Sequence, residues 1–268
     1  MTNDLITPSP PHPITLQTFG LIGRSLAHSF SQTYFTRKFE RLGLTDCRYE
    51  LFELSEIGEL PALLARYPDL AGLNVTIPYK EQIWPYLTRV ASSAALVGAV
   101  NVVEFQPDGS LVGHNTDYVG FRESLRRFYP GQGKAVSAGA RALVLGTGGA
   151  AKAVAVALRE LGIAHALVGR DPLAATLSYG DLSAEVIAAH PLIINTTPLG
   201  TYPAVDECPP LPYAALTPDH YLFDLIYNPR ETLFLRRARA AGAHAQNGFE
   251  MLELQAEAAW AIWGGVIR

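Results

Sequence analysis

Lys80 is placed where its amine could transfer a proton. The preceding residues, 72–77, form an apolar strand pattern in which Asn74 and Thr76 share one face. Pro78 ends this strand, and we predict that Lys80 lies in the first turn of a helix, whose positive end disfavours the protonated amine. Only four of the 21 basic residues are lysines, so a lysine at this strand end is a candidate proton-transfer group. The alternative is a surface lysine with an extended, solvated side chain.

Residues with carboxylate, amide or hydroxyl side chains lie within or directly after other predicted strands. Asp117 comes after a strand and lies at the start of a helix, where a negative charge is favoured. It is therefore either a reactive carboxylate or part of a plain helix cap, in which Thr116 or Asp117 is the N-cap. Asn101 interrupts an otherwise apolar strand. Ser29 and Ser31 lie just after the first strand, where two hydroxyls either hold a carboxylate or cap the next helix, and capping is the commoner role.

A glycine-rich turn joins a strand to a helix within residues 142–162, ALVLGTGGAAKAVAVALRELG. Gly146 allows the tight turn, Gly148 lets the backbone approach a pyrophosphate, and the small Ala151 lets helix and strand pack closely. The first amides of the helix then face the anion. Because a second strand follows about twenty residues later, as the dinucleotide fold requires, we predict a dinucleotide site. A glycine-rich turn without a ligand is the alternative.

The residues after this second strand bear on which dinucleotide binds. An NAD site usually places a carboxylate at the strand tip, where it holds the ribose hydroxyls. Here Arg170 comes first, and a guanidinium can hold a 2′-phosphate and stack on adenine, which favours NADP. Asp171 would oppose that phosphate if its side chain pointed inward. A solvated loop arginine is the alternative.

These residues need a scaffold, and the apolar pattern predicts an α/β fold with mainly parallel sheets. The predicted strands are residues 18–22, 48–54, 72–77, 99–105, 110–113, 142–145, 164–168, 192–195 and 221–225, and the predicted helices are residues 32–42, 57–67, 116–128, 150–161 and 233–241, with short helices near residues 79 and 92. A segment containing Pro and Gly, 129–141, is predicted to connect two domains. Near the C-terminus, a helical apolar stripe runs from Leu252 to Trp263, with Gln255 on its flank.

Length and composition limit the class of protein. The chain has 268 residues, of which 49% are apolar and 17% charged, so it can form one large or two smaller ordered domains. Its net charge of −4 without a basic stretch argues against a nucleic-acid partner. With only two cysteines, we do not expect a disulfide framework. The seven histidines are not spaced as metal ligands, so we do not expect a metal site. We find no secretory signal or membrane span and expect a cytoplasmic protein with a small-molecule substrate; a homodimer stays open.

Eight motifs resemble, in the same order, those of the shikimate dehydrogenase family, and the resemblance covers about residues 18–263. They are GLIGRSLAHSFS at residues 20–31, NVTIPYKE at 74–81, GAVN at 98–101, NTD at 115–117, GTGGA at 146–150, NTTPLG at 195–200, DLIYNP at 224–229 and MLELQA at 251–256. Such an ordered series is more specific than the glycine-rich turn alone. The resemblance implies a reversible, NADP-linked interconversion of 3-dehydroshikimate and shikimate in aromatic amino acid biosynthesis.

The resemblance also implies roles for residues at matching positions. Lys80 and Asp117 would form the catalytic pair, with Lys80 donating the proton as an ammonium group. The substrate carboxylate would be bound by Ser29, Ser31 and Tyr227, and the ring hydroxyls by Asn74, Thr76, Asn101 and Gln255. We expect cofactor contacts from Gly146, Thr147, Gly148, Gly149, Ala150, Arg170, Thr196 and Gly248.

A discontinuous substrate domain is a further implication, because the last helix of the family returns to the first domain. We expect a flexible extension at residues 1–14. Residues 15–117 and 248–268 would form a mainly parallel α/β substrate-binding domain. Residues 118–247 would form a Rossmann-like NADP-binding domain.

The sequence departs from the family pattern at several positions. Gln32 replaces a proline, Tyr34-Phe35 a His-Asn pair, Tyr118 a glycine, Thr201 a methionine, and Gly169-Arg170-Asp171 an Asn-Arg-Thr run. The last departure leaves the preference for NADP open. An NAD-linked quinate/shikimate dehydrogenase and a non-catalytic NADP-binding sensor stay as alternatives, although a sensor need not keep Lys80 and Asp117. A serine hydrolase is set aside because no G-x-S-x-G elbow is present.

Overall fold

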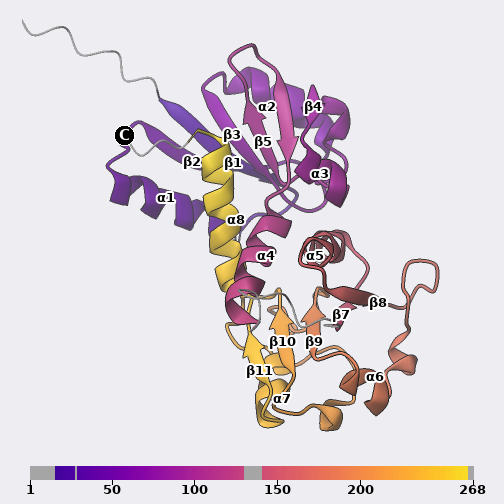
Figure 1. Ribbon diagram of the computed structural model, residues 1–268. Coiled ribbons are helices and arrows are strands. Elements are labelled where there is room, and N and C mark those ends of the chain that lie inside the picture. The colour runs from indigo at the N-terminus through magenta and orange to yellow at the C-terminus, as the bar shows by residue number, and fades with distance from the viewer. Residues whose placement is uncertain (1–15, 28, 130–140, 265–268) are drawn as a thin grey trace, which may run out of the picture.

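The chain folds into two halves, each built on one β-sheet (Figure 1). The computed structural model describes residues 16–27, 29–129 and 141–264. Helix α4 (Asp117–Phe128) leads from the first half to the second, and α8 (Phe249–Ile262) leads back, so that its C-terminal end lies beside α1 (Phe30–Leu42). This confirms the predicted α/β class with mainly parallel sheets. The expected extension, 1–14, and most of the expected connection, 129–141, lie outside the described residues.

The first sheet contains six strands in the order β2-β1-β3-β5-β6-β4. They are β1 (Gln17–Gly23), β2 (Cys47–Glu53), β3 (Leu70–Val75), β4 (Arg89–Val90), β5 (Val102–Phe105) and β6 (Leu111–His114). Strand β1 is parallel to β2 and β3, and β4 is parallel to β6, whereas β5 is antiparallel to β3 and β6. Helices α2 (Leu60–Arg66) and α3 (Ser92–Val97) cover one face of the sheet, and α1 and α8 cover the other.

Close packing fixes the position of α8. A side chain at Gly72 of β3 would place its Cβ 2.4 Å from the indole nitrogen of Trp263, so only glycine leaves room for that ring. The same nitrogen donates to the Val103 carbonyl at 3.0 Å. Helix α8 also crosses α4 at Gly120, where a Cβ would lie 2.6 Å from a backbone oxygen of α8. These contacts hold α8 at both ends and so determine where Gln255, between them, can reach.

The second sheet is entirely parallel, with five strands in the order β11-β10-β9-β7-β8. Its strands are β7 (Arg141–Leu145), β8 (Ala164–Val168), β9 (Leu192–Asn195), β10 (Tyr221–Asp224) and β11 (His244–Gln246), and its helices are α5 (Gly149–Glu160), α6 (Ala184–Ala188) and α7 (Leu233–Ala240). From β7 the chain passes to β8 on one side and then to β9 on the other side of β7. Ligands of doubly wound sheets bind at the carboxyl ends of the strands beside such a reversal.

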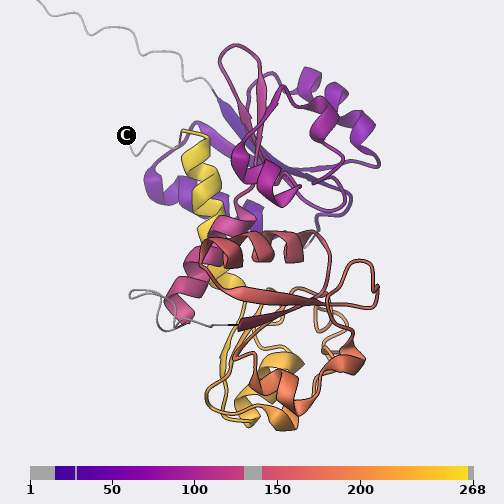
Figure 2. The ribbon, with the colours of Figure 1, turned by 45° about the vertical axis from the view of Figure 1, so that its right-hand side comes forward.

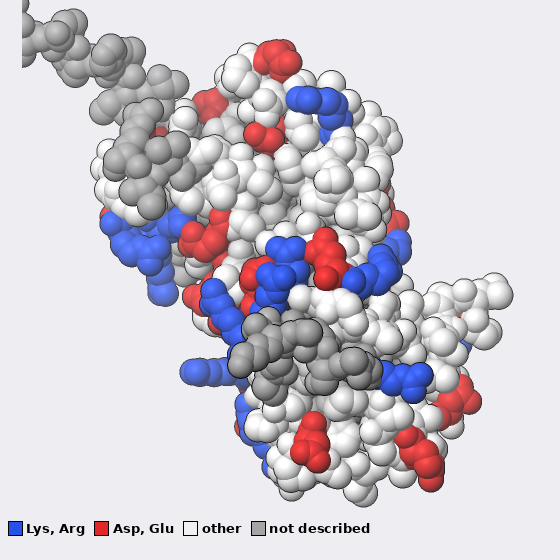
Figure 3. Space-filling model, in the orientation of Figure 1, with Lys and Arg blue, Asp and Glu red and all other residues white. Residues whose placement is uncertain are grey.

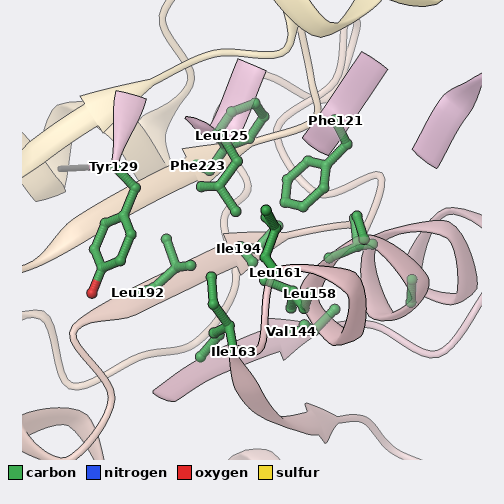
Figure 4. Packing of buried hydrophobic residues seen from close by; sticks show 14 residues of the cluster. Phe121, Leu125, Tyr129, Val144, Leu158, Leu161, Ile163, Leu192, Ile194 and Phe223 are labelled. Carbon is green, nitrogen blue, oxygen red and sulfur yellow. The ribbon is translucent and has the colours of Figure 1, made fainter. Parts of the chain in front are cut away.

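Apolar packing covers both faces of the second sheet. Figure 4 shows Phe121 and Leu125 of α4 beside Phe223 of β10, in a core that α5 completes. Helices α6 and α7 cover the opposite face. Helix α5 lies between the two sheets in Figures 1 and 2, and apolar residues of α3 pack against it, so the two halves are in direct contact. Acidic and basic side chains are interspersed over this region in Figure 3, and Arg122 of α4 pairs with Glu160 of α5 at 2.6 Å.

The structure corrects the expected helix at residue 79. Residues 79–83 form successive turns, and a 3-10 helix follows at Trp84–Tyr86. Pro85 accounts for this, because a proline inside a helix removes a backbone hydrogen bond and clashes with the carbonyl four residues earlier. Lys80 therefore lies in a turn, and the expected effect of a helix dipole on its amine is wrong.

Several short elements were not expected from the sequence. They are β4, α6, β11 and the 3-10 helices Ile57–Glu59, Tyr179–Asp181 and Tyr213–Ala215. Each has only two to five residues, too few for a helical or strand period to be read in the sequence. Strand β3 also ends at Val75 rather than residue 77, which leaves Thr76 in the loop beyond the strand.

Candidate active site

A cavity of about 370 Å³ opens where the carboxyl ends of β1 and β3 face the loop after β10. It includes all nine residues expected in catalysis or substrate binding: Ser29, Ser31, Asn74, Thr76, Lys80, Asn101, Asp117, Tyr227 and Gln255. Tyr227 comes from the second half and the rest from the first half or from α4 and α8, so the cavity lies between the two sheets.

Lys80 and Asp117 form an ion pair inside this cavity. Lys80 Nζ donates to Asp117 Oδ2 at 2.8 Å, and the two side chains are 29% and 18% exposed. The Lys80 carbonyl accepts from the Val100 amide at 2.8 Å, and the neighbouring Tyr79 is fully buried, so the turn that carries the lysine is anchored on both sides. The pair is thus both fixed and open to a ligand.

Asn101 joins several groups on the cavity wall. Its Nδ2 lies 2.9 Å from Asp117 Oδ1 and 3.1 Å from Gln255 Oε1. Its Oδ1 accepts from the Thr116 amide at 2.7 Å, which fixes the orientation of the Asn101 side chain. Asn101 therefore holds the second oxygen of Asp117 while the first faces Lys80. Because its Oε1 is engaged, Gln255 can offer N–H groups to the cavity.

Ser29 and Ser31 lie at the start of α1, and the capping role that the sequence allows is seen for Ser29. Ser29 is the N-cap of α1, and its Oγ accepts from the Ser31 amide at 3.2 Å. Both residues also line the cavity near Tyr227. Burial raises the pKa of Tyr227, so its phenol keeps the proton and can act as a hydrogen-bond donor. His28, which precedes Ser29, lies outside the described residues.

The glycine-rich turn is shaped to admit a phosphate. Gly146 has φ +113°, in the region that favours glycine, and a Cβ there would lie 2.6 Å from Thr196 Oγ1. At Gly148 and Gly149, by contrast, a Cβ would meet open space, and no side chain caps the first turn of α5. The amides at this helix start are therefore accessible to an anion, and the residues present fit a pyrophosphate. The turn and Thr196 lie at the strand reversal between β7 and β9.

Gly248, also expected to contact the cofactor, packs closely against the start of the loop after β10. It precedes α8, and a Cβ there would lie 2.1 Å from the Leu225 carbonyl oxygen. This close backbone approach is sufficient reason for a glycine at that position.

Arg170 and Asp171 follow β8 in a loop that folds back along the strand. Both are exposed, and Arg170 lies near Tyr179. Asp171 Oδ1 accepts from the Leu173 amide at 2.9 Å, so its carboxylate is held by its own loop. Asp171 is therefore engaged in a hydrogen bond within its own loop.

An ion pair links the second half of the molecule to the turn that carries Lys80. Lys152 Nζ, in the first turns of α5, donates to Glu81 Oε1 at 2.8 Å. Because Glu81 follows Lys80 directly, this contact places the start of α5 beside the Lys80–Asp117 pair. The glycine-rich turn and the cavity thus lie on the same side of the molecule.

Asp224, at the end of β10, is a buried carboxyl group that sequence reasoning did not single out. Its Oδ1 accepts from Asn195 Nδ2 at 3.0 Å and from the Ile226 amide at 3.1 Å, and its Oδ2 accepts from Thr232 Oγ1 at 2.5 Å. It therefore joins the loops after β9 and β10, the second of which carries Tyr227. Burial raises its pKa from 3.8 to about 6, although these hydrogen bonds act in the opposite direction.

This raised pKa predicts a pH-dependent loss of stability. The folded state binds the Asp224 proton more tightly than the unfolded state, so the contribution is complete below the unfolded pKa and is lost as pH rises through about 6. Relative to Asp224→Asn, the unfolding free energy of the native chain should fall by about 2 kcal/mol between about pH 4 and pH 7. Urea unfolding of both proteins across this range measures the difference. Parallel pH profiles would contradict the prediction.

Three departures from the family pattern have structural explanations. The Tyr34 hydroxyl donates to Glu257 of α8, and Phe35 is buried and stacked on Tyr49. At Gly169, a Cβ would lie 2.8 Å from a methyl group of Thr147, so the close approach of the glycine-rich turn favours glycine there. The structure offers no explanation for Thr201.

Two features are absent from residues 16–27, 29–129 and 141–264. None of their helices combines the length and the apolar character needed to cross a membrane. Within the same ranges, no group of three or more His, Cys, Asp or Glu side chains is placed to hold a metal ion.

The fold and the cavity define the class: two-domain α/β proteins in which a dinucleotide-binding sheet closes against a second sheet. Residues 21–103 match the family model described as the shikimate dehydrogenase substrate binding domain. The chain is 35% identical to a shikimate dehydrogenase (NADP(+)) of Desulforamulus reducens, over 93% of this chain and 90% of that protein. For the enzyme of the same name from Moorella thermoacetica, the identity is 39%, over 91% and 87%. The chain belongs to the shikimate dehydrogenase family, which confirms the resemblance seen in the sequence.

Solved structures agree with this assignment. A shikimate 5-dehydrogenase from Thermus thermophilus, in complex with NADP(H) and shikimate, is 33% identical, with a TM-score of 0.80 over 94% of each chain. A quinate dehydrogenase from Corynebacterium glutamicum, in complex with NAD, is 29% identical, with a TM-score of 0.82 over 94% of each chain. The two-domain fold is therefore shared by enzymes that differ in substrate and cofactor.

Proposed function

We propose that this chain catalyses the reversible, NADP-linked reduction of 3-dehydroshikimate to shikimate, a step of aromatic amino acid biosynthesis. The observation that carries the proposal is the Lys80–Asp117 pair, 2.8 Å apart in a cavity that lies beside the dinucleotide turn. Relatives named shikimate dehydrogenase (NADP(+)) cover nearly the whole chain and support the same activity and cofactor.

The chain's own residues supply the proton and the positioning. When bound, NADP exchanges a hydride with the substrate carbon. Lys80, as ammonium, donates a proton to the carbonyl oxygen during reduction and takes it back as an amine during oxidation. Asp117 accepts a hydrogen bond from Lys80 and can accept another from the reacting hydroxyl, which orients that hydroxyl. Much of the rate enhancement is expected from the fixed geometry of these groups.

Substrate recognition follows from the groups that face the cavity. The substrate carboxylate is assigned to the hydroxyls of Ser29, Ser31 and Tyr227, which can all donate. The ring hydroxyls are assigned to Asn74, Thr76, Asn101 and Gln255. The cofactor is assigned to Gly146, Thr147, Gly148, Gly149, Ala150, Arg170, Thr196 and Gly248. In this proposal, residues 15–117 and 248–268 form the substrate domain and residues 118–247 the cofactor domain.

An activity matrix tests the proposal. Purified protein is supplied with NADP or NAD and with shikimate or quinate, and the absorbance of the reduced nicotinamide is followed. We expect the highest kcat/KM for NADP with shikimate. A preference for NAD and quinate would favour the NAD-linked quinate/shikimate dehydrogenase. If the absorbance does not change with any pair, the non-catalytic NADP-binding sensor is the alternative that is left.

The cellular setting is part of the proposal. Cys47 and Cys208 are both free thiols, which suits the reducing cytoplasm. Light scattering of the purified protein tests the homodimer that the sequence leaves open.

A further inference from the structure

A buried tyrosine hydroxyl lies behind the wall of the cavity. Tyr49 of β2 is 4% exposed, and its ring stacks on Phe35 of α1 with centroids 4.7 Å apart and an interplanar angle of 7°. Its hydroxyl donates to Asn74 Oδ1 at 2.7 Å. Since Asn74 lines the cavity, Tyr49 contacts a residue to which a substrate hydroxyl is assigned.

The contact spans three strands of the first sheet. Tyr49 of β2 pairs with Phe19 of β1, and Leu21 of β1 pairs with Asn74 of β3. Neighbouring strands lie about 4.8 Å apart, so the two side chains together bridge two such spacings. A serine or threonine at position 49 would hold its hydroxyl too close to the backbone to reach Asn74. A phenylalanine would extend far enough but would bring no hydrogen-bond donor.

The partners of Asn74 allow one orientation of its amide. The Asn101 carbonyl oxygen can only accept, and Asn74 Nδ2 donates to it at 3.3 Å. Asn74 Oδ1 must then face Tyr49, whose hydroxyl is the donor. Among the described residues, the second hydrogen of Nδ2 has no acceptor. Asn74 therefore offers the cavity a donor and not an acceptor.

We propose that Tyr49 is a positioning residue: by donating to Oδ1, its hydroxyl holds Asn74 with an N–H directed at a hydroxyl oxygen of the substrate ring. This inference rests on the proposed function, because it takes shikimate as the ligand. Tyr49 acts through Asn74 and has no part in proton transfer at Lys80. Without the hydroxyl, the amide of Asn74 can rotate, so substrate binding weakens while turnover of bound substrate is kept.

A double-mutant cycle tests this role. We measure KM for shikimate and kcat at saturating NADP for the native enzyme, Tyr49→Phe, Asn74→Ala and the double variant. We expect Tyr49→Phe to raise KM by about 3- to 10-fold, as for loss of one hydrogen bond, with kcat within about twofold. In the Asn74→Ala background, the same change should leave KM nearly constant. Equal increases in both backgrounds would overturn the inference, and would point to Ser31, the other polar neighbour of the Tyr49 hydroxyl.

Two further variants separate positioning from folding. Tyr213→Phe is the matched control, because Tyr213 packs against the core of the second half, away from the cavity, and its hydroxyl donates to a backbone carbonyl, that of Pro209, at 2.8 Å. It should lower the melting temperature without changing KM. Asn74→Asp keeps an acceptor for Tyr49 but replaces the N–H that faces the cavity, so it should raise KM more than Tyr49→Phe does.

The outcomes distinguish this inference from the function on which it rests. A native enzyme that does not oxidise shikimate overturns both. If the native enzyme is active but Tyr49→Phe or Asn74→Asp has the same KM for shikimate as the native enzyme, the positioning role alone is overturned. If Tyr49→Phe does not fold, Asn74→Asp decides, because it tests the same orientation of the amide without removing the buried ring.

Discussion

Replacing Lys80 by alanine is expected to lower kcat by about 10²- to 10⁴-fold, the usual contribution of a positioned proton donor. The Kd for shikimate should change little, because Lys80 has its short contact with Asp117 and the other cavity groups remain to bind the ring. Steady-state rates with NADP and shikimate give kcat, and calorimetric titration of the variant with shikimate gives the Kd.

Lys80→Arg separates proton transfer from charge. The guanidinium keeps a cation beside Asp117, yet it does not give up a proton under assay conditions. We therefore expect a loss of turnover close to that of the alanine variant. Recovery of activity in Lys80→Arg would mean that the positive charge alone is needed, and near-normal turnover in Lys80→Ala would remove the lysine from the mechanism.

The sequence predicts most helices and central strands of the fold because each one satisfies its pattern locally. Residues 192–195 form β9 as predicted, since four apolar or amide residues lie between Pro191 and a run of turn-forming residues. The turn at Lys80 was missed because its neighbour Tyr79 continues the apolar pattern that suggests a helix, while Pro85, six residues later, prevents one.

The cavity could be predicted as a set of residues only through the family resemblance. Spacing along the chain does not bring Asn101 and Gln255 together, since they lie 154 residues apart and meet only because α8 returns to the first sheet. The tight crossing at Gly120 and the Trp263 contact that hold α8 are properties of the packed structure.

Tyr49 and Asp224 show what sequence reasoning misses. Each is buried and acts on a residue that was identified, Tyr49 on Asn74 and Asp224 on the loop that carries Tyr227. Neither belongs to a spacing that signals chemistry, because their partners are set by strand order and by loop packing. A tyrosine in a strand is ordinarily a core residue. Its hydroxyl becomes informative only once the acceptor is known.

Replacing Arg170 by alanine is expected to weaken NADPH binding by about 1.5–3 kcal/mol, the range for a hydrogen bond to a charged group, which is about 10- to 150-fold in Kd. NADH lacks the 2′-phosphate, so its Kd should change by less than about threefold. Fluorescence titration of the native protein and the variant with each cofactor measures both values. Equal losses for the two cofactors would mean that Arg170 contacts the shared part of the dinucleotide.

Asp171→Asn is the matched control, because it changes the neighbouring charge and can keep the hydrogen bond from the Leu173 amide. If the carboxylate is directed into its own loop, this substitution should leave the ratio of the two Kd values within about threefold, since an exposed charge at that distance is largely screened. A strong gain for NADPH would show instead that Asp171 faces the ribose. The cofactor preference of this chain would then come from opposing charges at adjacent positions, with Arg170 favouring the phosphate that Asp171 repels.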